Sequence, residues 1–323
     1  MNQKFAAWLR PLFAGVCFAV ASAVAQTYPE HAIKLIVPYV PGGGADVIAR
    51  YIAKGLTQSL GQTVIVENHT GAGGVVGTDY GISQPADGYT LTLISSSYTV
   101  NPSLYKLRFD SIKDITPIIQ VSKGPMVLVA NPKLGLKSVA DLVKLAKDKP
   151  GSLNYGSSGT GSVLHLAGAL FADRAGVQMT HIPYKGGAAA MTDLLSGQVD
   201  LYFAASATAM SQVKGGRVTA LGVTSAERVP ALPDVPTVAE TGFPGYDVTL
   251  WYGLVGPKGM SPALVQRINT EVNKILAEPE AAKKLEVDGA YTAGGTSEAF
   301  GATIGKEVAM WHQVVDKLHI KVD

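Results

Sequence analysis

The sequence predicts an α/β protein of two lobes, each a mostly parallel sheet flanked by helices, with a cleft between the lobes. Short apolar runs rich in β-branched residues alternate with segments of helical period, which is the pattern of a parallel α/β sheet. This alternation occurs in two complete sets along the chain. The chain of 323 residues also exceeds the usual size of one domain, so two compact units are expected.

The chain begins with the features of a cleavable signal peptide over residues 1–25. Lys4 and Arg10 make the start basic, a short apolar run covers residues 12–20, and small residues precede a cleavage site at Gln26. The apolar run is shorter than the roughly 20 residues that cross a bilayer, so a membrane anchor is the weaker alternative. We therefore expect a mature protein in the periplasm.

Cysteine content and charge exclude several classes of function. Cys17, the only cysteine, lies inside the expected signal peptide, which excludes a disulfide framework, a thiolate metal site and a cysteine nucleophile. Removing Lys4 and Arg10 lowers Lys+Arg from 27 to 25, which equals the 25 Asp+Glu, so the mature formal charge is 0. A neutral chain lacks the basic surface that nucleic acids require, and no nucleic-acid partner is expected.

The first set of elements follows the order strand, helix, strand, helix, strand. Strands are expected at 33–37, 63–67 and 90–94, with helices at about 45–60 and 74–84. In the first helix Ile48, Ile52 and Leu56 recur every four residues, which places them on one face.

The second set begins with a strand at 127–130. Ser138, three residues before Asp141, marks a helix start, and Gly151 closes that helix. The remaining elements are expected as strands at 153–155, 180–183 and 200–204 and as helices at 162–175 and 188–195.

The C-terminal part from Pro262 onward is expected to be mainly helical and to pack onto the first lobe. Its apolar stripe consists of Leu264, Ile268, Val272 and Ile275. We therefore assign residues 26–126 and 252–323 to lobe 1 and residues 127–251 to lobe 2. The crossing segments near 125–127 and 247–252 are expected to form the hinge.

Three glycine-rich loops, at 41–46, 71–74 and 156–162, fall where a predicted strand ends and a helix begins. In α/β sheets ligands bind outside the carboxyl ends of the strands. Glycine there lets backbone N–H groups and helix N-termini approach an anion. None of the loops has a dinucleotide-binding or P-loop motif, so a carboxylate or another small anion is the predicted ligand.

Patterns for metal binding and nucleophilic catalysis are missing from the sequence. The six histidines form no metal motif and are interpreted as hydrogen-bonded structural residues. Ser157 and Ser158 lie on a strand-to-helix turn, as a nucleophile would, but the G-x-S-x-G spacing is absent. Their hydroxyls are interpreted as donors to a ligand oxygen, with a secreted α/β hydrolase as the alternative. We expect no cofactor, no metal and no enzymatic activity.

The sequence leaves open whether Lys185 and Asp46 contact the ligand or have structural roles. Lys185 follows a predicted strand and either pairs with an acid or remains in solvent. Asp46 lies in the first turn of a helix. It either stabilises that terminus and shapes the glycine loop, or meets an ammonium group of the ligand.

Short strings distributed over nearly the whole mature chain match one family in order. They are Val37–Gly43 with Asp46, Val66–Asn68 with Gly71–Gly74, Asp87–Leu91, Asn101–Tyr105, Asn154–Gly159, Pro183–Gly186, Asp193–Asp200 and Leu232–Thr237. Each string is weak alone, but together they are highly specific. On these residues the chain resembles the solute-binding receptors of tripartite tricarboxylate transporters, often called Bug receptors.

The resemblance implies a two-lobed periplasmic binding protein fold that closes on a small organic acid and delivers it to the subunits of a membrane transporter. A sensing receptor that contacts a sensor kinase is the alternative. The resemblance also implies that the loops 39–46 and 157–162 grip the carboxylate from opposite lobes, through backbone groups, hydroxyls and ordered water. The receptor is expected to be a monomer.

The resemblance and the loops together give a set of expected ligand contacts. They are Tyr39, Gly42, Gly43, Gly44, Asp46, Ser96, Tyr98, Ser157, Ser158, Thr160, Ser162, Tyr184, Ala205 and Asp247. Tyr98 lies where family members often carry small or polar residues, and Ala205 lies just beyond Phe203, where family members often carry Asn or Asp. We assign Tyr98 and Ala205 to the distal end of the pocket. A less polar distal end suits an aromatic or longer-chain mono- or dicarboxylate better than citrate or aspartate.

Overall fold

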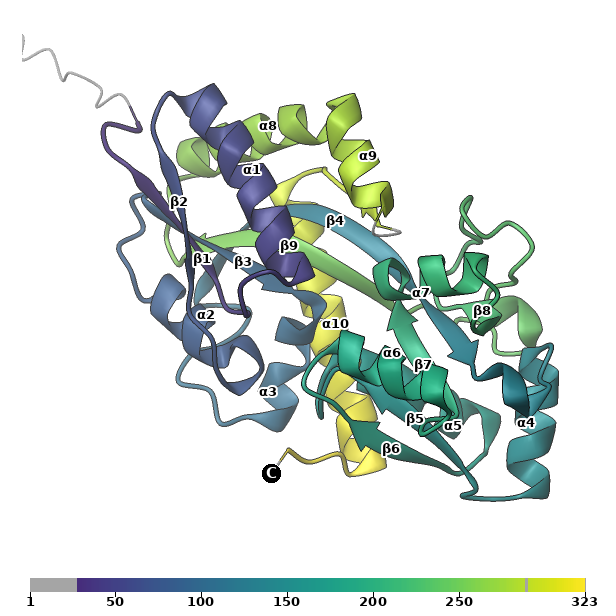
Figure 1. The fold of residues 1–323 in the computed structure, drawn as a ribbon. Helices are drawn as coiled ribbons and strands as arrows, with labels where there is room; N and C mark the ends of the chain where they lie inside the picture. The colour runs from purple at the N-terminus through teal and green to yellow at the C-terminus, as the bar shows by residue number, and fades with distance from the viewer. Residues whose placement is uncertain (1–27, 288–289, 323) are drawn as a thin grey trace, which may run out of the picture.

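The computed structural model describes residues 28–287 and 290–322 and confirms the α/β fold in two lobes (Figure 1). The expected signal peptide lies outside the described residues. The strands are β1 Ile33–Val37, β2 Val64–Asn68, β3 Thr90–Ser95, β4 Ile115–Ala130, β5 Leu153–Ser157, β6 Met179–Pro183, β7 Leu201–Ala205, β8 Thr219–Val223, β9 Thr249–Pro257 and β10 Tyr291–Thr292. The helices are α1 Gly44–Leu60, α2 Val75–Ile82, α3 Asn101–Leu104, α4 Val139–Asp148, α5 Val163–Ala175, α6 Gly187–Ser196, α7 Ser206–Lys214, α8 Pro262–Leu276, α9 Pro279–Val287 and α10 Ser297–Leu318.

The two lobes share one curled sheet, because β4 runs through both of them (Figure 1). The strand order is β2-β1-β3-β9-β4-β7-β5-β6, and β8 and β10 also pair with β4. Pairing is parallel among β1, β2 and β3 and among β5, β6 and β7, where helices connect the strands. The strands β4 and β9 are antiparallel to their neighbours. The sheet is therefore mixed rather than mostly parallel.

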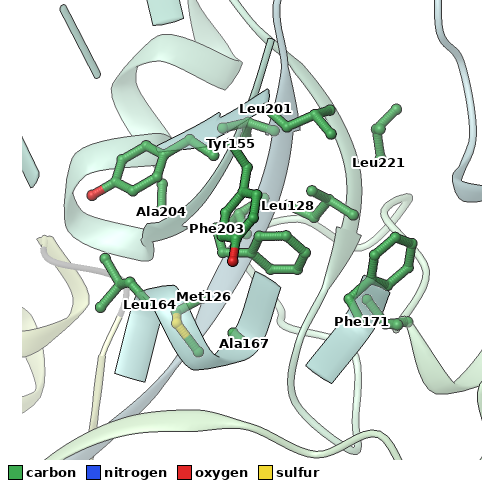
Figure 2. Close-up of a cluster of buried hydrophobic side chains, with 14 of the residues drawn as sticks. Met126, Leu128, Tyr155, Leu164, Ala167, Phe171, Leu201, Phe203, Ala204 and Leu221 are labelled. Atoms are coloured by element: carbon green, nitrogen blue, oxygen red, sulfur yellow. The ribbon is translucent and has the colours of Figure 1, made fainter. Parts of the chain in front are cut away.

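Each lobe has its own apolar core. In lobe 1 the predicted stripe of α1 packs against α8, whose Ile268 and Val272 are fully buried. The two helices approach so closely that a Cβ atom on Gly55 would lie 2.7 Å from Ile275. Figure 2 shows the core of lobe 2, in which Met126, Leu128, Tyr155, Phe171 and Phe203 gather between sheet and helices.

The C-terminal helix α10 contacts both lobes, whereas the sequence assigned the whole C-terminal part to lobe 1. Phe300 and Ile304, in its first half, pack in a cluster with Trp251 of β9. Trp311 and Val315, in its second half, belong to the core of lobe 2. The helix α8 packs in the core of lobe 1, whereas α10, with 22 residues, is long enough to continue past the crossing strands.

A partly buried carboxylate joins α10 to the crossing strand β9. Glu307 accepts hydrogen bonds from Trp251 Nε1 at 2.8 and 3.0 Å and from Thr99 Oγ1 at 3.0 Å. Burial raises the pKa of Glu307 from its ordinary 4.5 to about 7, against the lowering effect of these bonds. Among the described helices, none is both long and apolar enough to cross a membrane.

Candidate functional site

A cavity of about 320 Å³ opens between the lobes, and we call it the interlobe cavity. Both lobes and the crossing strands supply its walls. The lining residues are Tyr39, Val40, Gly43, Gly44, Ala45, Ile48, Ser95, Ser97, Ser122, Gly124, Pro125, Ser158, Leu164, Gly187, Tyr202, Ala205, Ser206, Thr208, Leu250, Tyr252 and Ala290. The cavity lies where strands of both lobes end, as the glycine-rich loops predicted.

The walls combine apolar surface with many hydroxyl groups, and the described lining residues carry no charge. Nine of the lining residues carry a hydroxyl group, and none of the described lining residues is an acid, a base or a histidine. Two of these hydroxyls contact each other, because Tyr39 Oη lies 2.6 Å from Ser95 Oγ, and Tyr39 Oη also accepts from Ser95 N at 3.2 Å. An anion held here would be stabilised by oriented dipoles and hydroxyls instead of ion pairs.

Three helices begin at the interlobe cavity. The first residues of α1, α6 and α7 are Gly44, Gly187 and Ser206, and all three line it. Their N-cap residues are Gly43, Gly186 and Ala205, and no side chain of the described residues caps these helices. The first N–H groups of a helix have no partner within the helix, so they are available to a ligand at the positive end of the helix dipole.

Helices that begin away from the interlobe cavity are different. In α4, α8 and α10 the N-cap side chains of Ser138, Ser261 and Thr296 accept from backbone N–H groups of the first turn. The Ser138 cap also confirms the predicted start of α4. The short helices α2 and α3 have no side-chain cap either, and α2 follows directly on the 3₁₀ turn Ala72–Gly74.

Five of the predicted contact residues line the interlobe cavity: Tyr39, Gly43, Gly44, Ser158 and Ala205. They come from the first and third glycine-rich loops and from the end of β7. The structure thus brings together residues of both lobes that are more than 100 positions apart. The remaining predicted residues lie around the cavity or away from it.

In the first glycine loop, Gly42 and Asp46 do not line the interlobe cavity. Asp46 accepts from Gly42 N at 3.0 Å, from Arg50 at 2.9 and 3.1 Å, and from Asn68 Nδ2 at 3.0 Å. The Arg50 guanidinium holds the pKa of the Asp46 carboxyl below its ordinary value. Gly42 has φ +78°, a conformation that favours glycine. These contacts support the loop-shaping interpretation of Asp46.

Tyr98 and Ser96 do not line the interlobe cavity. Tyr98 is buried in the cluster with Trp251 and donates its hydroxyl to Ser111 O at 2.7 Å. Ser96 is also buried, and its Oγ has no hydrogen-bond partner among the described residues. Neither side chain contributes to the distal wall to which the sequence assigned Tyr98.

Four more predicted residues lie in lobe 2, and three of them form local hydrogen bonds. Ser162 caps α5 by accepting from His165 N, and Thr160 is half-buried in the loop before it. Tyr184 donates to Asp193 Oδ2 at 2.8 Å. Asp247 is exposed and accepts from Ala226 N at 3.2 Å. None of them lines the interlobe cavity, and Lys185 is exposed to solvent.

Ser157 forms a pair with a histidine, which bears on the hydrolase alternative. Its Oγ lies 2.7 Å from His181 Nε2, and the His181 ring stacks on His165 at 3.7 Å. Burial lowers the pKa of His165 to about 3 and of His181 to about 4, so both rings are neutral. Ser157 is fully buried and does not line the interlobe cavity. Among the described residues, the ring that lies against His181 is the imidazole of His165, where a catalytic triad would have a carboxylate. The pair fits a structural role better than that of a nucleophile and its base.

Sequence reasoning missed several cavity residues on strands. Ser122 on β4 and Tyr202 on β7 are buried, line the cavity, and have hydroxyls without a hydrogen-bond partner among the described residues. The signal that could have found them is a polar atom inside an apolar strand, since a buried hydroxyl needs a partner.

Comparisons with known proteins give a consistent result. The family model described as the tripartite tricarboxylate transporter family receptor matches residues 48–320. Protein BugT of Bordetella pertussis is 36% identical over 314 residues, which are 96% of this chain and 96% of that protein.

Solved structures of similar proteins support the same assignment. The R. palustris protein Rpa4515, solved with adipate, is 33% identical with a TM-score of 0.82, covering 91% of this chain and 100% of that one. The periplasmic binding protein BugD is 34% identical with a TM-score of 0.78, covering 91% of this chain and 100% of that one.

Proposed function

The chain belongs to the tripartite tricarboxylate transporter receptor family, and from this membership we propose that it captures a small organic acid in the interlobe cavity and delivers it to a membrane transporter. In this role the protein is a receptor that does no chemistry on its ligand. The similar structure that was solved with adipate supports a carboxylic acid as the ligand class.

The observation that carries the proposal is an uncharged cavity onto which uncapped helix N-termini converge from both lobes. We propose that the ligand carboxylate lies between the first turn of α1, at Gly44 and Ala45, and the Ser158 hydroxyl of lobe 2. The helix supplies backbone donors and a positive dipole end, and the serine supplies a neutral donor. Contacts from opposite lobes would link ligand binding to closure of the cleft.

The body of the ligand is proposed to be apolar. Val40, Ile48, Leu164 and Leu250 line the interlobe cavity together with several alanine and glycine residues. Such walls favour an aliphatic chain or an aromatic ring over a densely hydroxylated acid such as citrate, because a hydroxyl without a partner is costly to bury. We therefore propose an aromatic or longer-chain acid.

A thermal-shift screen of a carboxylate library, with the primary amide of each acid as its control, tests the proposal. Acids should raise the melting temperature and their amides should not, because the helix N-termini stabilise negative charge. NMR of the recovered ligand should show it unchanged after incubation. Equal shifts for acids and amides, no shift for any acid, or a converted ligand would contradict the proposal.

We also propose that the protein acts in the periplasm as a monomer, after removal of residues 1–25. Membership of a family of periplasmic binding proteins supports the compartment. Intact-mass measurement of the secreted protein should give a chain that begins at Gln26. A mass that retains the leader, or that carries a lipid on Cys17, would contradict the proposed processing.

A further inference from the structure

Tyr202 carries a polar group that the fold leaves without a partner. It lies on β7, its exposed fraction is 0%, and it lines the interlobe cavity. No described residue forms a hydrogen bond with its Oη. Burying a hydroxyl without a partner destabilises a folded protein, so each such group requires an explanation.

The Tyr202 hydroxyl lies against the first residue of α6. A Cβ atom on Gly187 would stand only 2.6 Å from Tyr202 Oη and 3.8 Å from Thr208 Oγ1. Two hydroxyls therefore lie close to the N-terminus of α6, which no described side chain caps. Burial raises the pKa of Tyr202, so the phenol stays protonated and can donate. A phenol donor and an uncapped helix N-terminus thus lie side by side at the wall of the interlobe cavity.

A similar arrangement occurs in lobe 1. A Cβ atom on Gly44, the first residue of α1, would lie 3.2 Å from Tyr252 Oη, and the N-cap Gly43 provides no side chain. The interlobe cavity thus has two corners, one in each lobe, where a helix begins with a glycine against a tyrosine hydroxyl. Apolar side chains such as Ile48 and Leu164 also line the cavity.

We propose that Tyr202 and the N-terminus of α6 determine specificity by binding a second oxygen of the ligand, away from the anchored carboxylate. This inference rests on the proposed function, because it takes the acid to be bound in the same cavity. The ligand is then an acid with two oxygen functions joined by an apolar body. A dicarboxylate and a hydroxy-substituted aromatic acid both have this chemistry.

Calorimetry with two matched pairs of probes tests the inference on the full mature chain. The pairs are adipate with hexanoate, and 4-hydroxybenzoate with benzoate, so that each pair differs in its second oxygen. In at least one pair the parent protein should bind the oxygen-bearing acid about tenfold more tightly than its partner. Tyr202→Phe should reduce that preference to about one, by weakening the oxygen-bearing acid and leaving its partner unchanged.

Tyr246→Phe is the matched control. Tyr246 is fully buried in the same lobe, but its hydroxyl donates to Ala167 O at 2.7 Å and it does not line the interlobe cavity. The control should lose thermal stability and keep the ligand preference. Tyr202→Phe should keep the stability of the free protein or raise it, because it removes an unpartnered hydroxyl. Gly187→Ala should also reduce the preference, since its methyl group would displace the phenol.

The outcomes separate this inference from the proposed function. If Tyr202→Phe weakens both members of a pair equally or neither of them, the inference is wrong while acid binding stands. If neither adipate nor 4-hydroxybenzoate binds the parent but other acids of the library do, the inference is again wrong. If no acid binds the parent, the proposed function fails and this inference fails with it. A preference in the adipate pair would identify the second oxygen function as a carboxylate, and a preference in the 4-hydroxybenzoate pair would identify it as a hydroxyl.

Discussion

A side-chain cap on α1 should stabilise the helix and weaken the binding of acids. In the proposed site the first N–H groups of α1 bind the ligand because Gly43 leaves them uncapped. Gly43→Ser would place a hydroxyl at the N-cap, where it can accept from these groups, and Gly43→Asp would place a carboxylate there. The serine hydroxyl, a neutral acceptor, and the aspartate carboxylate, a charged one, would each compete with the ligand for these N–H groups.

The local geometry allows both substitutions. Gly43 has φ −78° and ψ 170°, which is ordinary for an N-cap residue with a side chain. A Cβ atom there would have Val40 O at 3.4 Å and Val40 Cγ2 at 4.0 Å as neighbours, which is normal contact. The fold should therefore tolerate either residue.

The expected changes have opposite signs. Serine in place of glycine at an N-cap adds a few tenths of a kcal/mol of stability. A hydrogen bond to a charged group contributes about 1.5–3 kcal/mol, so losing one to the new cap should lower affinity about 10- to 100-fold. Gly43→Asp should weaken binding further through charge repulsion. Its gain in stability should be smaller than for serine, because Asp46 already lies in the same turn.

Calorimetry with the tightest acid from the library, together with thermal unfolding, gives both quantities. Ser261→Ala is the control, since Ser261 caps α8 away from the interlobe cavity and accepts from Leu264 N at 3.3 Å. It should cost about 1 kcal/mol of stability and leave affinity unchanged. If Gly43→Asp binds the acid as tightly as the parent does, α1 is not part of the site and the reasoning is refuted.

The remaining predictions concern Ser158, Glu307 and the motion of the lobes. Ser158→Ala should weaken every acid that the protein binds by about 1–3 kcal/mol in calorimetry, and unchanged affinity would remove this hydroxyl from the site. Because burial raises the Glu307 pKa to about 7, the folded chain binds more protons there than the unfolded chain between pH 4.5 and 7. The parent should therefore lose on the order of 2 kcal/mol of stability relative to Glu307→Gln as pH rises through this range, after allowing for partial exposure. Parallel stability–pH curves from urea unfolding would show that this carboxylate does not titrate as described. Small-angle scattering should show a smaller radius of gyration with saturating acid, and an unchanged radius would count against closure about β4 and β9.

The helix-connected parts of the fold were predictable from the sequence because their signals are local. The strand at Ile33–Val37 has the predicted bounds. The helix α1, whose apolar residues recur every four positions, begins one residue earlier than predicted. The cap at Ser138 is a contact within one turn, which a three-residue spacing reveals.

The crossing strands were harder to predict because their pairing is not local. Only residues 127–130 of β4 were expected as a strand, although β4 begins at Ile115. Gly124 and Pro125 interrupt the strand pattern, and the partner Leu250 that pairs with Gly124 lies more than 100 residues away. The sequence indicated crossing segments near 125–127 and 247–252, but not the length of β4 or its pairing with β9.

The residues that line the interlobe cavity were predicted in part, on two loops and at Ala205 at the end of β7, but not in the interior of the strands. Gly43, Gly44 and Ser158 lie in glycine-rich loops, whose composition indicates a ligand. Ser122 and Tyr202 lie inside apolar runs, where only the folded arrangement shows that a side chain faces a cavity. Tyr98 was predicted to contact the ligand, but its hydroxyl donates to Ser111 O and its side chain does not line the cavity.

A crystal structure of the protein with the tightest acid from the library tests the central claim most directly. The account predicts the acid in the interlobe cavity, with carboxylate oxygens about 2.7–3.2 Å from a backbone N of the first turn of α1 and from Ser158 Oγ. It also predicts no lysine or arginine within hydrogen-bond distance of that carboxylate. An acid bound outside the cavity, or a carboxylate paired with a basic side chain such as Lys185, would contradict the account.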